Sequence, residues 1–465
     1  PSSIPELRLD DLAHRVPGQL ADAGEIAWNL VGRETRPRPF REVVELLLES
    51  SEAEAGDRLD IDPRERLVHK AVAAVIDEMR RRQSLRLPWA AAHQIVNGIL
   101  PGRSRSLSLL DFLLREGILR EIQVASSGSA DEVMFGFERL GEFLLGQALV
   151  AEVSTGADLR EVFTFRDEIA ATNGSAAGLN EALAILLPES VGQELFDVDP
   201  AGESQKLLLA TVRSLAWRAP DSITERTKRL LRGAIGQLRD STPALDEAFA
   251  LAARANHPLD SSFLDDLLSP LDQAQRDQLL CPFLHGSWED QGAVYRLSTW
   301  AIEPELGKPT ADTTLAWCST LAWCCAAADR RPRDHATMGM VALLERRSEV
   351  IAPLLERFLP VNDDYIVERV FLAAYGALIR ADDAESTRAA AAVVYESLFA
   401  ETPPLNALIR DHGRCIIELA AHRRALPEID STRYLPPYGS SLPAGLVVGE
   451  EERGEVRSPF LRRNE

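Results

Sequence analysis

DPRERLVHKAVAAVIDEMRRR, residues 62–82, opens the segment that decides the fold, which we place at residues 62–150. Asp62 is positioned to cap a helix, Pro63 suits the first helical position, and Glu65 has the spacing of a capping box. The sequence then places arginines at 80–82, where the negative end of the helix dipole would lie. Apolar residues recur at helical spacing and predict one buried stripe: Leu67, Val68, Ala71, Val72, Val75, Ile76 and Met79.

Two more helices and two strands are expected in the rest of this segment. The second helix should start at Leu87-Pro88-Trp89 and run through Ile99, and the third should span residues 104–116, before Gly117. Residues 118–125 and 133–137 favour strands, and Ser126-Ser127-Gly128-Ser129 supplies the turn between them. Three helices followed by a small β-hairpin, or wing, predict a winged-helix unit.

Winged-helix units often bind DNA, but the charge of this sequence argues against that function. The third helix is apolar almost all round, and no lysine or arginine lies between Glu121 and Phe137. The chain has a formal net charge of -21 and a pI near 5.0, opposite to the footprint of a nucleic-acid-binding protein. A local basic patch remains an alternative to solvated surface arginines, and would involve Arg103, Arg105, Arg115 and Arg120.

Length and composition set limits on the rest of the chain. With 465 residues and 45% hydrophobic content, the chain can bury a large core. Its apolar runs fall short of the roughly 20 residues that a membrane-spanning helix needs, and its first residues do not resemble a signal peptide. Five cysteines, none in CxxC spacing, indicate a reducing compartment without disulfides or a zinc site. We therefore expect a cytoplasmic protein that does not contact membranes.

After about residue 150, short helical patterns separated by Pro, Gly and Asp predict a helical array. Arg333-Asp334-His335-Ala336, Tyr365-Ile366-Val367-Glu368 and Arg410-Asp411-His412-Gly413 each lead into an apolar run. Their separations of roughly 32 and 45 residues bracket the period of HEAT-like helix pairs. Asp363 and Asp364 stand where the N-terminal charges of a helix are expected.

These patterns together predict a mainly α fold. A winged-helix unit with a small β-hairpin should be followed by an α-helical, HEAT- or TPR-like repeat array. The expected parts are a helical lead-in (residues 1–61), the winged-helix domain (62–150), a helical connector (151–240), a helical-repeat sensor domain (241–438) and a flexible tail (439–465).

Six stretches, in this order, resemble the Avs proteins, which are bacterial antiviral NTPases of the STAND class. They correspond to the region that follows the nucleotide-binding core in that family, and they span most of residues 60–440. The stretches are Leu87-Pro88-Trp89, FGFERLGEFLLGQA (135–148), RDHATM (333–338), VNDDYIVERVFLAAYG (361–376), LIRDHGRCIIELA (408–420) and YLPPYGS (434–440).

The resemblance implies an NTPase that senses a phage protein through helical repeats, oligomerises with bound ATP and Mg²⁺, and activates an effector domain. This chain departs from that pattern because it contains no GxxxxGK[ST] loop. Its only Gly-Lys pair, Gly307-Lys308, precedes Pro309 and lacks the upstream glycine. We therefore predict no catalytic, cofactor or metal site in this chain and no ATP hydrolysis by it, with ATP and Mg²⁺ belonging to the full-length family.

Several residues are candidates for binding a partner. Arg333, Asp334, Arg369, Arg410 and Asp411 would form either a ligand surface or caps and ladders between stacked repeats, and we favour caps and ladders. The proline-rich segment with Tyr434 and Tyr438 would either grip a partner or clamp the last repeat.

Two further groups have both a functional and a structural interpretation. Arg139 and Glu142 either contact the nucleotide-binding core in the full-length protein or lie on an intramolecular helix face, and we favour the second. The cluster of Trp317, Cys318, Trp323, Cys324 and Cys325 is predicted to be buried packing rather than a metal site.

Three classes of function fit these observations. The leading hypothesis is the sensor portion of an antiviral STAND NTPase, with a phage protein as partner and self-oligomerisation in the full-length protein. The alternatives are a helical-repeat scaffold or adaptor without a nucleotide link, and a winged-helix transcription regulator, whose DNA affinity would fall steeply with salt. In the leading hypothesis, the repeats between about Ser241 and Leu426 bind a protein, and the acidic chain prefers a basic one.

Overall fold

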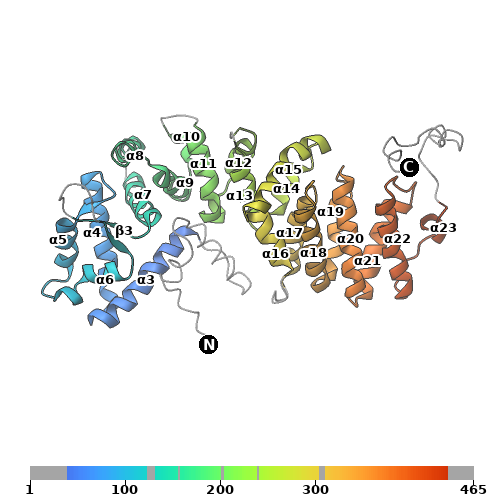
Figure 1. Ribbon diagram of the computed structural model, residues 1–465, viewed down its shortest axis with the longest axis horizontal. Helices are drawn as coiled ribbons and strands as arrows, with labels where there is room; N and C mark the ends of the chain where they lie inside the picture. Colours follow the sequence, from blue (N-terminus) through green and yellow to red (C-terminus); the bar gives the residue numbers. More distant parts are fainter. Residues whose placement is uncertain are drawn as a thin grey trace, which may run out of the picture. The chain divides into compact units, whose positions relative to one another are not determined.

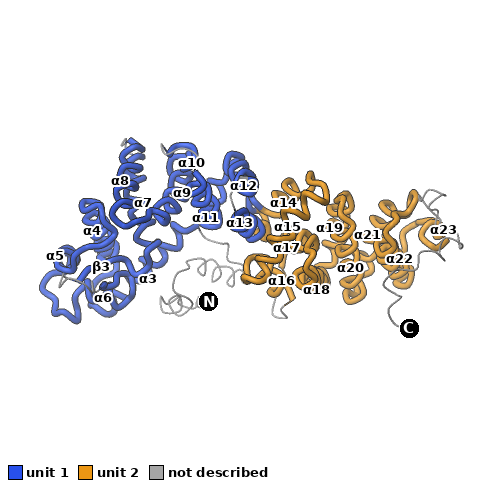
Figure 2. The backbone as a smooth tube through the Cα atoms, turned by 45° about the horizontal axis from the view of Figure 1, so that its top comes forward, with its two compact units in different colours: residues 1–251, 257–259 blue, residues 252–256, 260–465 orange. Residues whose placement is uncertain are grey.

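The computed structural model describes residues 39–122, 131–154, 158–199, 204–237, 240–302 and 309–437. Over these ranges the chain is mainly helical, as predicted, with one three-stranded sheet (Figure 1). It divides into two compact units, unit 1 (residues 1–251 and 257–259) and unit 2 (residues 252–256 and 260–465) (Figure 2). The expected tail, the turn at 126–129 and Tyr438 lie outside the described residues.

Unit 1 begins with helices that surround the small sheet. The antiparallel sheet has the order β1-β3-β2, with Leu87 opposite Val133 and Leu119 opposite Phe135. In chain order the elements are α3 (Phe40–Leu59), η1 (Pro63–Glu65), α4 (Leu67–Arg82), β1 (Leu87–Pro88), α5 (Trp89–Ile99), η2 (Arg105–Leu107), α6 (Leu109–Arg115), β2 (Leu119–Ile122) and β3 (Glu132–Phe135).

The sheet and the third helix differ from the prediction. Instead of opening the second helix, Leu87 and Pro88 form a strand that pairs with β3, so the sheet has three strands rather than two. The third helix starts at Leu109 rather than at 104, because the Ser108 hydroxyl accepts the Asp111 N–H and caps it there.

The start of α4 also differs, whereas its buried stripe is as predicted. Asp62 caps only the short turn η1, by accepting the Arg64 N–H at 3.0 Å. The helix itself begins at Leu67, and Glu52 of α3 accepts the N–H groups of Val68 and His69 at 3.1 and 3.0 Å. A buried carboxylate from the neighbouring helix therefore takes the place of the predicted capping box.

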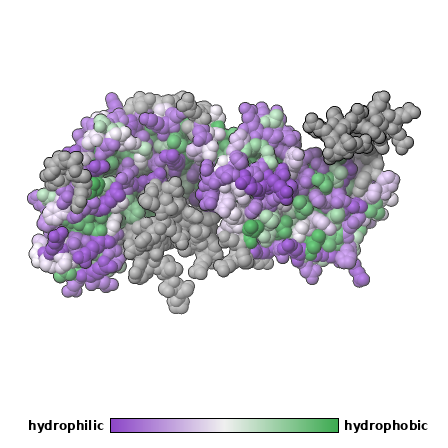
Figure 3. Space-filling view, in the orientation of Figure 1, coloured by the Kyte–Doolittle hydropathy of each residue, from purple (hydrophilic) through white to green (hydrophobic). Residues whose placement is uncertain are grey.

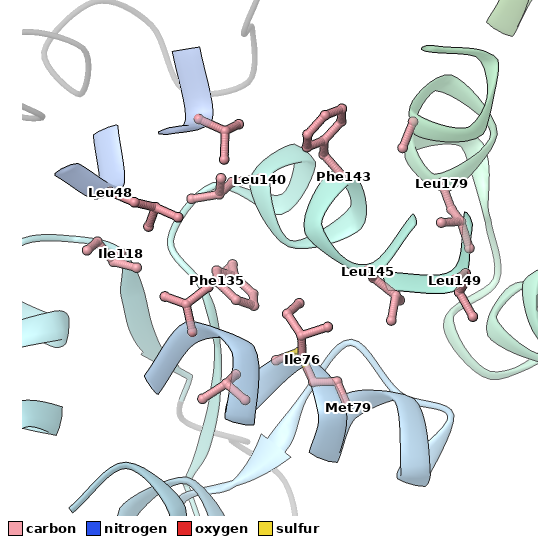
Figure 4. Packing of buried hydrophobic residues seen from close by; sticks show 14 of the residues in the cluster. Leu48, Ile76, Met79, Ile118, Phe135, Leu140, Phe143, Leu145, Leu149 and Leu179 are labelled. Atoms are coloured by element: carbon pink, nitrogen blue, oxygen red, sulfur yellow. The ribbon is translucent and has the colours of Figure 1, made fainter. Parts of the chain in front are cut away.

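The rest of unit 1 packs against the sheet through α7. Labelled side chains of α4, β3, α7 and α9 gather in one core (Figure 4). At Gly141 the helix runs so close to the sheet that a Cβ atom would lie 2.7 Å from the Phe135 ring. The elements are α7 (Glu138–Ser154), α8 (Leu159–Asn173), α9 (Ala177–Ser190), α10 (Leu195–Val198), α11 (Gln205–Ser214), η3 (Leu215–Trp217), η4 (Pro220–Ser222), α12 (Glu225–Gln237) and α13 (Thr242–Ala252).

Unit 2 consists of helix hairpins stacked in two layers. Helices α16, α18, α20 and α22 pack side by side in one layer, and α17, α19 and α21 form the other. The elements are α14 (Ser261–Leu268), α15 (Gln273–Glu289), α16 (Ala293–Ala301), α17 (Ala311–Cys324), α18 (Arg330–Arg346), η5 (Ser348–Val350), α19 (Ile351–Phe358), α20 (Asp364–Arg380), α21 (Ala384–Val394), η6 (Tyr395–Phe399), α22 (Ala407–His422) and α23 (Ser431–Tyr434).

The tryptophan–cysteine cluster of α17 is buried packing, as predicted. Trp317, Cys318, Trp323, Cys324 and Cys325 are all buried. Burial raises the pKa of the Cys325 thiol to about 12 and also raises the pKa of the Cys318 and Cys324 thiols, which disfavours the reactive thiolates. Within the described ranges, no helix combines the length and apolar character that crossing a bilayer requires.

Candidate protein-binding surface

Asp334 and Arg369 form a ladder between two successive hairpins. The Arg369 Nη1 lies 2.9 Å from Asp334 Oδ1 and thereby joins α20 to α18. Arg330 holds the other oxygen of Asp334 at 2.8 Å. The helix cap of α18 is Asp329, which accepts the Arg331 N–H, so Asp334 is not a cap.

Arg410 and Asp411 also lie inside a helix and do not cap it. Asn406 caps α22 by accepting the N–H groups of Leu408 and Ile409. Arg410 donates to the carbonyl of Leu405 at 2.8 Å, which fixes the loop before α22. Asp411 pairs with Arg414 of the same helix at 2.7 Å. The expected role of Asp411 as a cap is therefore wrong.

Tyr434 is enclosed at the end of the array. Its side chain is 6% exposed, and its ring centroid lies 6.5 Å from that of Phe399. Tyr434 is therefore packed against the last hairpin.

Large apolar side chains are exposed on the layer that contains α18, α20 and α22. Nine large apolar side chains are exposed among the described residues, and five belong to these helices or to the loop before α22. Figure 3 shows hydrophobic residues interspersed with hydrophilic ones on the visible face of unit 2. The five are Met338, Tyr365, Ile379, Leu405 and Leu408. Clustering of this kind is typical of an interaction surface rather than of scattered surface residues.

Three of the five lie at the N-terminal ends of α20 and α22 or in the loop just before α22. Tyr365, Leu405 and Leu408 are 57%, 55% and 50% exposed. The Asn406 amide, next to Leu405, donates to the Asp364 carboxylate, next to Tyr365, at 3.3 Å. The Arg333 guanidinium lies 5.8 Å from the centre of the Tyr365 ring. We call the surface formed by Arg333, Tyr365, Leu405 and Leu408 the N-terminal edge.

The layer that carries this edge does not share the acidity of the chain. Four arginines and two acidic residues lie in α18, and two of each lie in α20 and in α22. The three helices thus carry a net charge of +2, with histidine neutral, whereas the chain carries -21. The acidic residues are therefore concentrated elsewhere in the sequence.

Arg139 and Glu142 lie together at the junction of α7 and α9 in unit 1. Arg139 and Arg213 bind the two oxygens of Glu181 at 3.0 and 3.2 Å. Glu142 accepts the N–H of Leu179 in the first turn of α9. A Cβ atom at position 178 would lie 1.7 Å from Glu142 Oε2, so only glycine admits the carboxylate there. Both residues thus bond within unit 1.

The pKa of Glu142 is raised to about 7, chiefly by burial and then by the nearby carboxylates of Glu138 and Glu181, while Arg139 opposes the rise. The folded protein therefore keeps a proton that the unfolded chain has released between about pH 4.5 and pH 7. We expect the free energy of unfolding to fall as the pH rises through this window. Glu142→Gln should remove the part of that fall that Glu142 contributes and add on the order of 2 kcal/mol above the window. Denaturant unfolding across the window measures both effects.

The control for this experiment is Glu161→Gln, at an exposed glutamate of α8, which should leave the pH profile unchanged. If the native chain and Glu142→Gln gave parallel profiles, the protonation of Glu142 would not be linked to folding.

A group that the sequence did not reveal lies between α15 and α18. His285, Glu289 and Asp329 place potential metal-ligand atoms within 4.8 Å of one another. The Arg331 guanidinium lies 2.5 Å from Glu289 and 2.7 Å from Asp329. Because Arg331 already binds both carboxylates, the group is best described as an ion-pair cluster.

Comparison of the chain with protein-family models, with curated proteins and with solved structures gave no match.

Proposed function

We propose that this chain is the winged-helix and helical-repeat sensor portion of a bacterial antiviral STAND NTPase. In this proposal it recognises a phage protein and relays binding to ATP-dependent oligomerisation and effector activation in the full-length protein. The observation that carries the proposal is the N-terminal edge, where apolar side chains are exposed on stacked helices. Such a surface is suited to binding a protein.

The arrangement of α4 to β3 supports a winged-helix assignment. The order helix, strand, helix, helix, strand, strand, with the first strand pairing to the last, is the order found in winged-helix domains. The hairpins from α15 to α22 support an array of the HEAT or TPR type, because each hairpin packs chiefly on its neighbours.

The contacts of the winged-helix segment weigh against a transcription regulator. In α6, Leu109, Leu110, Phe112 and Leu113 are buried, so this helix offers little surface to a DNA groove. Two of the candidate basic residues are in ion pairs, Arg115 with Asp111 and Arg120 with Glu138.

The test is to co-express the tagged chain with each protein of an infecting phage and to measure which protein it retains. One phage protein should be retained, and Tyr365→Ala combined with Leu408→Ala should weaken binding about tenfold or more, because aromatic anchors dominate interface energies. Leu46→Ala, at an exposed leucine of α3 in unit 1, is the matched control. Retention of no phage protein would favour the scaffold alternative. Equal retention by the edge variant would place recognition elsewhere.

A further inference from the structure

We infer that the partner segment that docks on the N-terminal edge is apolar and acidic. This inference rests on the proposed function and adds the chemistry of the partner. The net charge of -21 alone predicts a basic partner, and the inference reverses that expectation.

Three acidic residues around the edge, Asp334, Asp364 and Asp411, are already bonded. Asp334 is held by both Arg330 and Arg369, at 2.8 and 2.9 Å. Asp411 pairs with Arg414, and Asp364 accepts the Asn406 amide. Two of these carboxylates are thus paired with arginines of this chain, which weakens their attraction for a basic partner.

Arg333 carries a positive charge and makes different contacts. Its Nη1 donates to the Ala327 carbonyl at 3.3 Å, and its guanidinium lies over the Tyr365 ring. Among the described residues no carboxylate forms an ion pair with Arg333, and its buried Nε has no hydrogen-bond partner. A carboxylate brought by a partner would thus meet a positive charge that no acidic side chain of the described parts neutralises.

At the N-terminal edge, apolar contact by a partner favours a carboxylate beside it. A partner that covers Tyr365 and Leu408 also removes water from the neighbouring Arg333. Covering a guanidinium without a counter-charge is unfavourable, and a carboxylate beside the apolar contact offsets that loss. The bond from Arg410 to the Leu405 carbonyl fixes the backbone that carries the third apolar side chain.

The experiment is a selection of random peptides displayed on yeast against the purified full chain. Enriched peptides should combine aromatic or aliphatic residues with Asp or Glu. Their binding should weaken about tenfold or more in Tyr365→Ala combined with Leu408→Ala. Arg333→Glu should weaken the same peptides, and a fresh selection on that variant should enrich Lys and Arg instead. Arg388→Glu, at an exposed arginine of α21, is the charge-matched control and should change neither result.

Different outcomes would contradict the partner chemistry and the placement of recognition at the N-terminal edge. If edge-dependent peptides were basic, or were insensitive to Arg333→Glu, the partner chemistry would be wrong while the edge remained a binding surface. If no enriched peptide depended on Tyr365 and Leu408, both the partner chemistry and the placement of recognition at this edge would be overturned.

Discussion

Replacing Arg218 by methionine is expected to lower the free energy of unfolding of unit 1 by about 3–5 kcal/mol. Arg218 is 3% exposed and binds both oxygens of Glu194, at 3.0 and 2.9 Å. Its Nε also donates to the Ser214 hydroxyl at 2.9 Å. The Thr227 hydroxyl donates to the same glutamate. Methionine fills similar space but leaves the Glu194 carboxylate buried with only one hydroxyl donor. A buried charge without its partner strongly destabilises the folded state.

Hydrogen exchange of the intact chain, followed by mass spectrometry, measures this loss in peptides that cover α10 to α12. Arg226→Met is the matched control, because Arg226 joins α12 to Asp197 of α10 in a partly exposed pair, for which a change of about 0–1 kcal/mol is expected. Adding Glu194→Leu to Arg218→Met should restore much of the protection, since no unpaired charge remains. Unchanged exchange in Arg218→Met would show that the pair does not hold these helices together.

Local patterns were sufficient to predict the buried face of α4. Every residue of the apolar stripe predicted for α4 is buried, because a 3.6-residue repeat determines which face of a helix is covered. Asp363 caps α20 as its position suggested, by accepting the N–H groups of Tyr365 and Ile366.

Features that depend on distant partners were missed. Nothing near Leu87 shows that it pairs with Val133, and nothing near Leu67 shows that Glu52 of another helix satisfies the first turn of α4. For the same reason, the sequence indicated only part of the N-terminal edge. Arg333 was named from the sequence, but Tyr365 and Leu408 belong to amphipathic helices whose apolar residues are expected in the core.

Replacing Arg276 by methionine should destabilise unit 2 by a similar amount, about 3–5 kcal/mol. Arg276 of α15 is fully buried, and its guanidinium lies 5.6 Å from the centre of the Trp323 ring. It donates to the Leu268 carbonyl at 2.9 Å and to the side chain of Asn362, and its Nε lies 3.6 Å from Asp363. One cation thus joins α15 to the end of α14, to α17 and to the start of α20.

The loss should be larger at neutral than at acidic pH. Burial raises the pKa of Asp363, while Arg276 opposes that rise. Without the arginine the pKa of Asp363 should rise further, so the folded variant takes up a proton as the pH falls, while the unfolded chain still lacks one. The free energy of unfolding of Arg276→Met should therefore approach that of the native chain as the pH falls through the pKa of Asp363 in the folded variant. Denaturant unfolding at several pH values measures this recovery, and Arg388→Met, at an exposed arginine, should show neither effect.

Arg276→Met should also weaken binding at the N-terminal edge, although Arg276 is buried and makes no contact there. Asp363, which Arg276 helps to hold, caps the helix turn that carries Tyr365. If that turn is less ordered in the free variant, ordering Tyr365 on binding costs free energy and weakens the affinity. The weakening should follow the pH dependence of stability and be smallest at acidic pH. A variant that is destabilised but binds edge-dependent peptides with native affinity at neutral pH would show that the start of α20 stays ordered without this network.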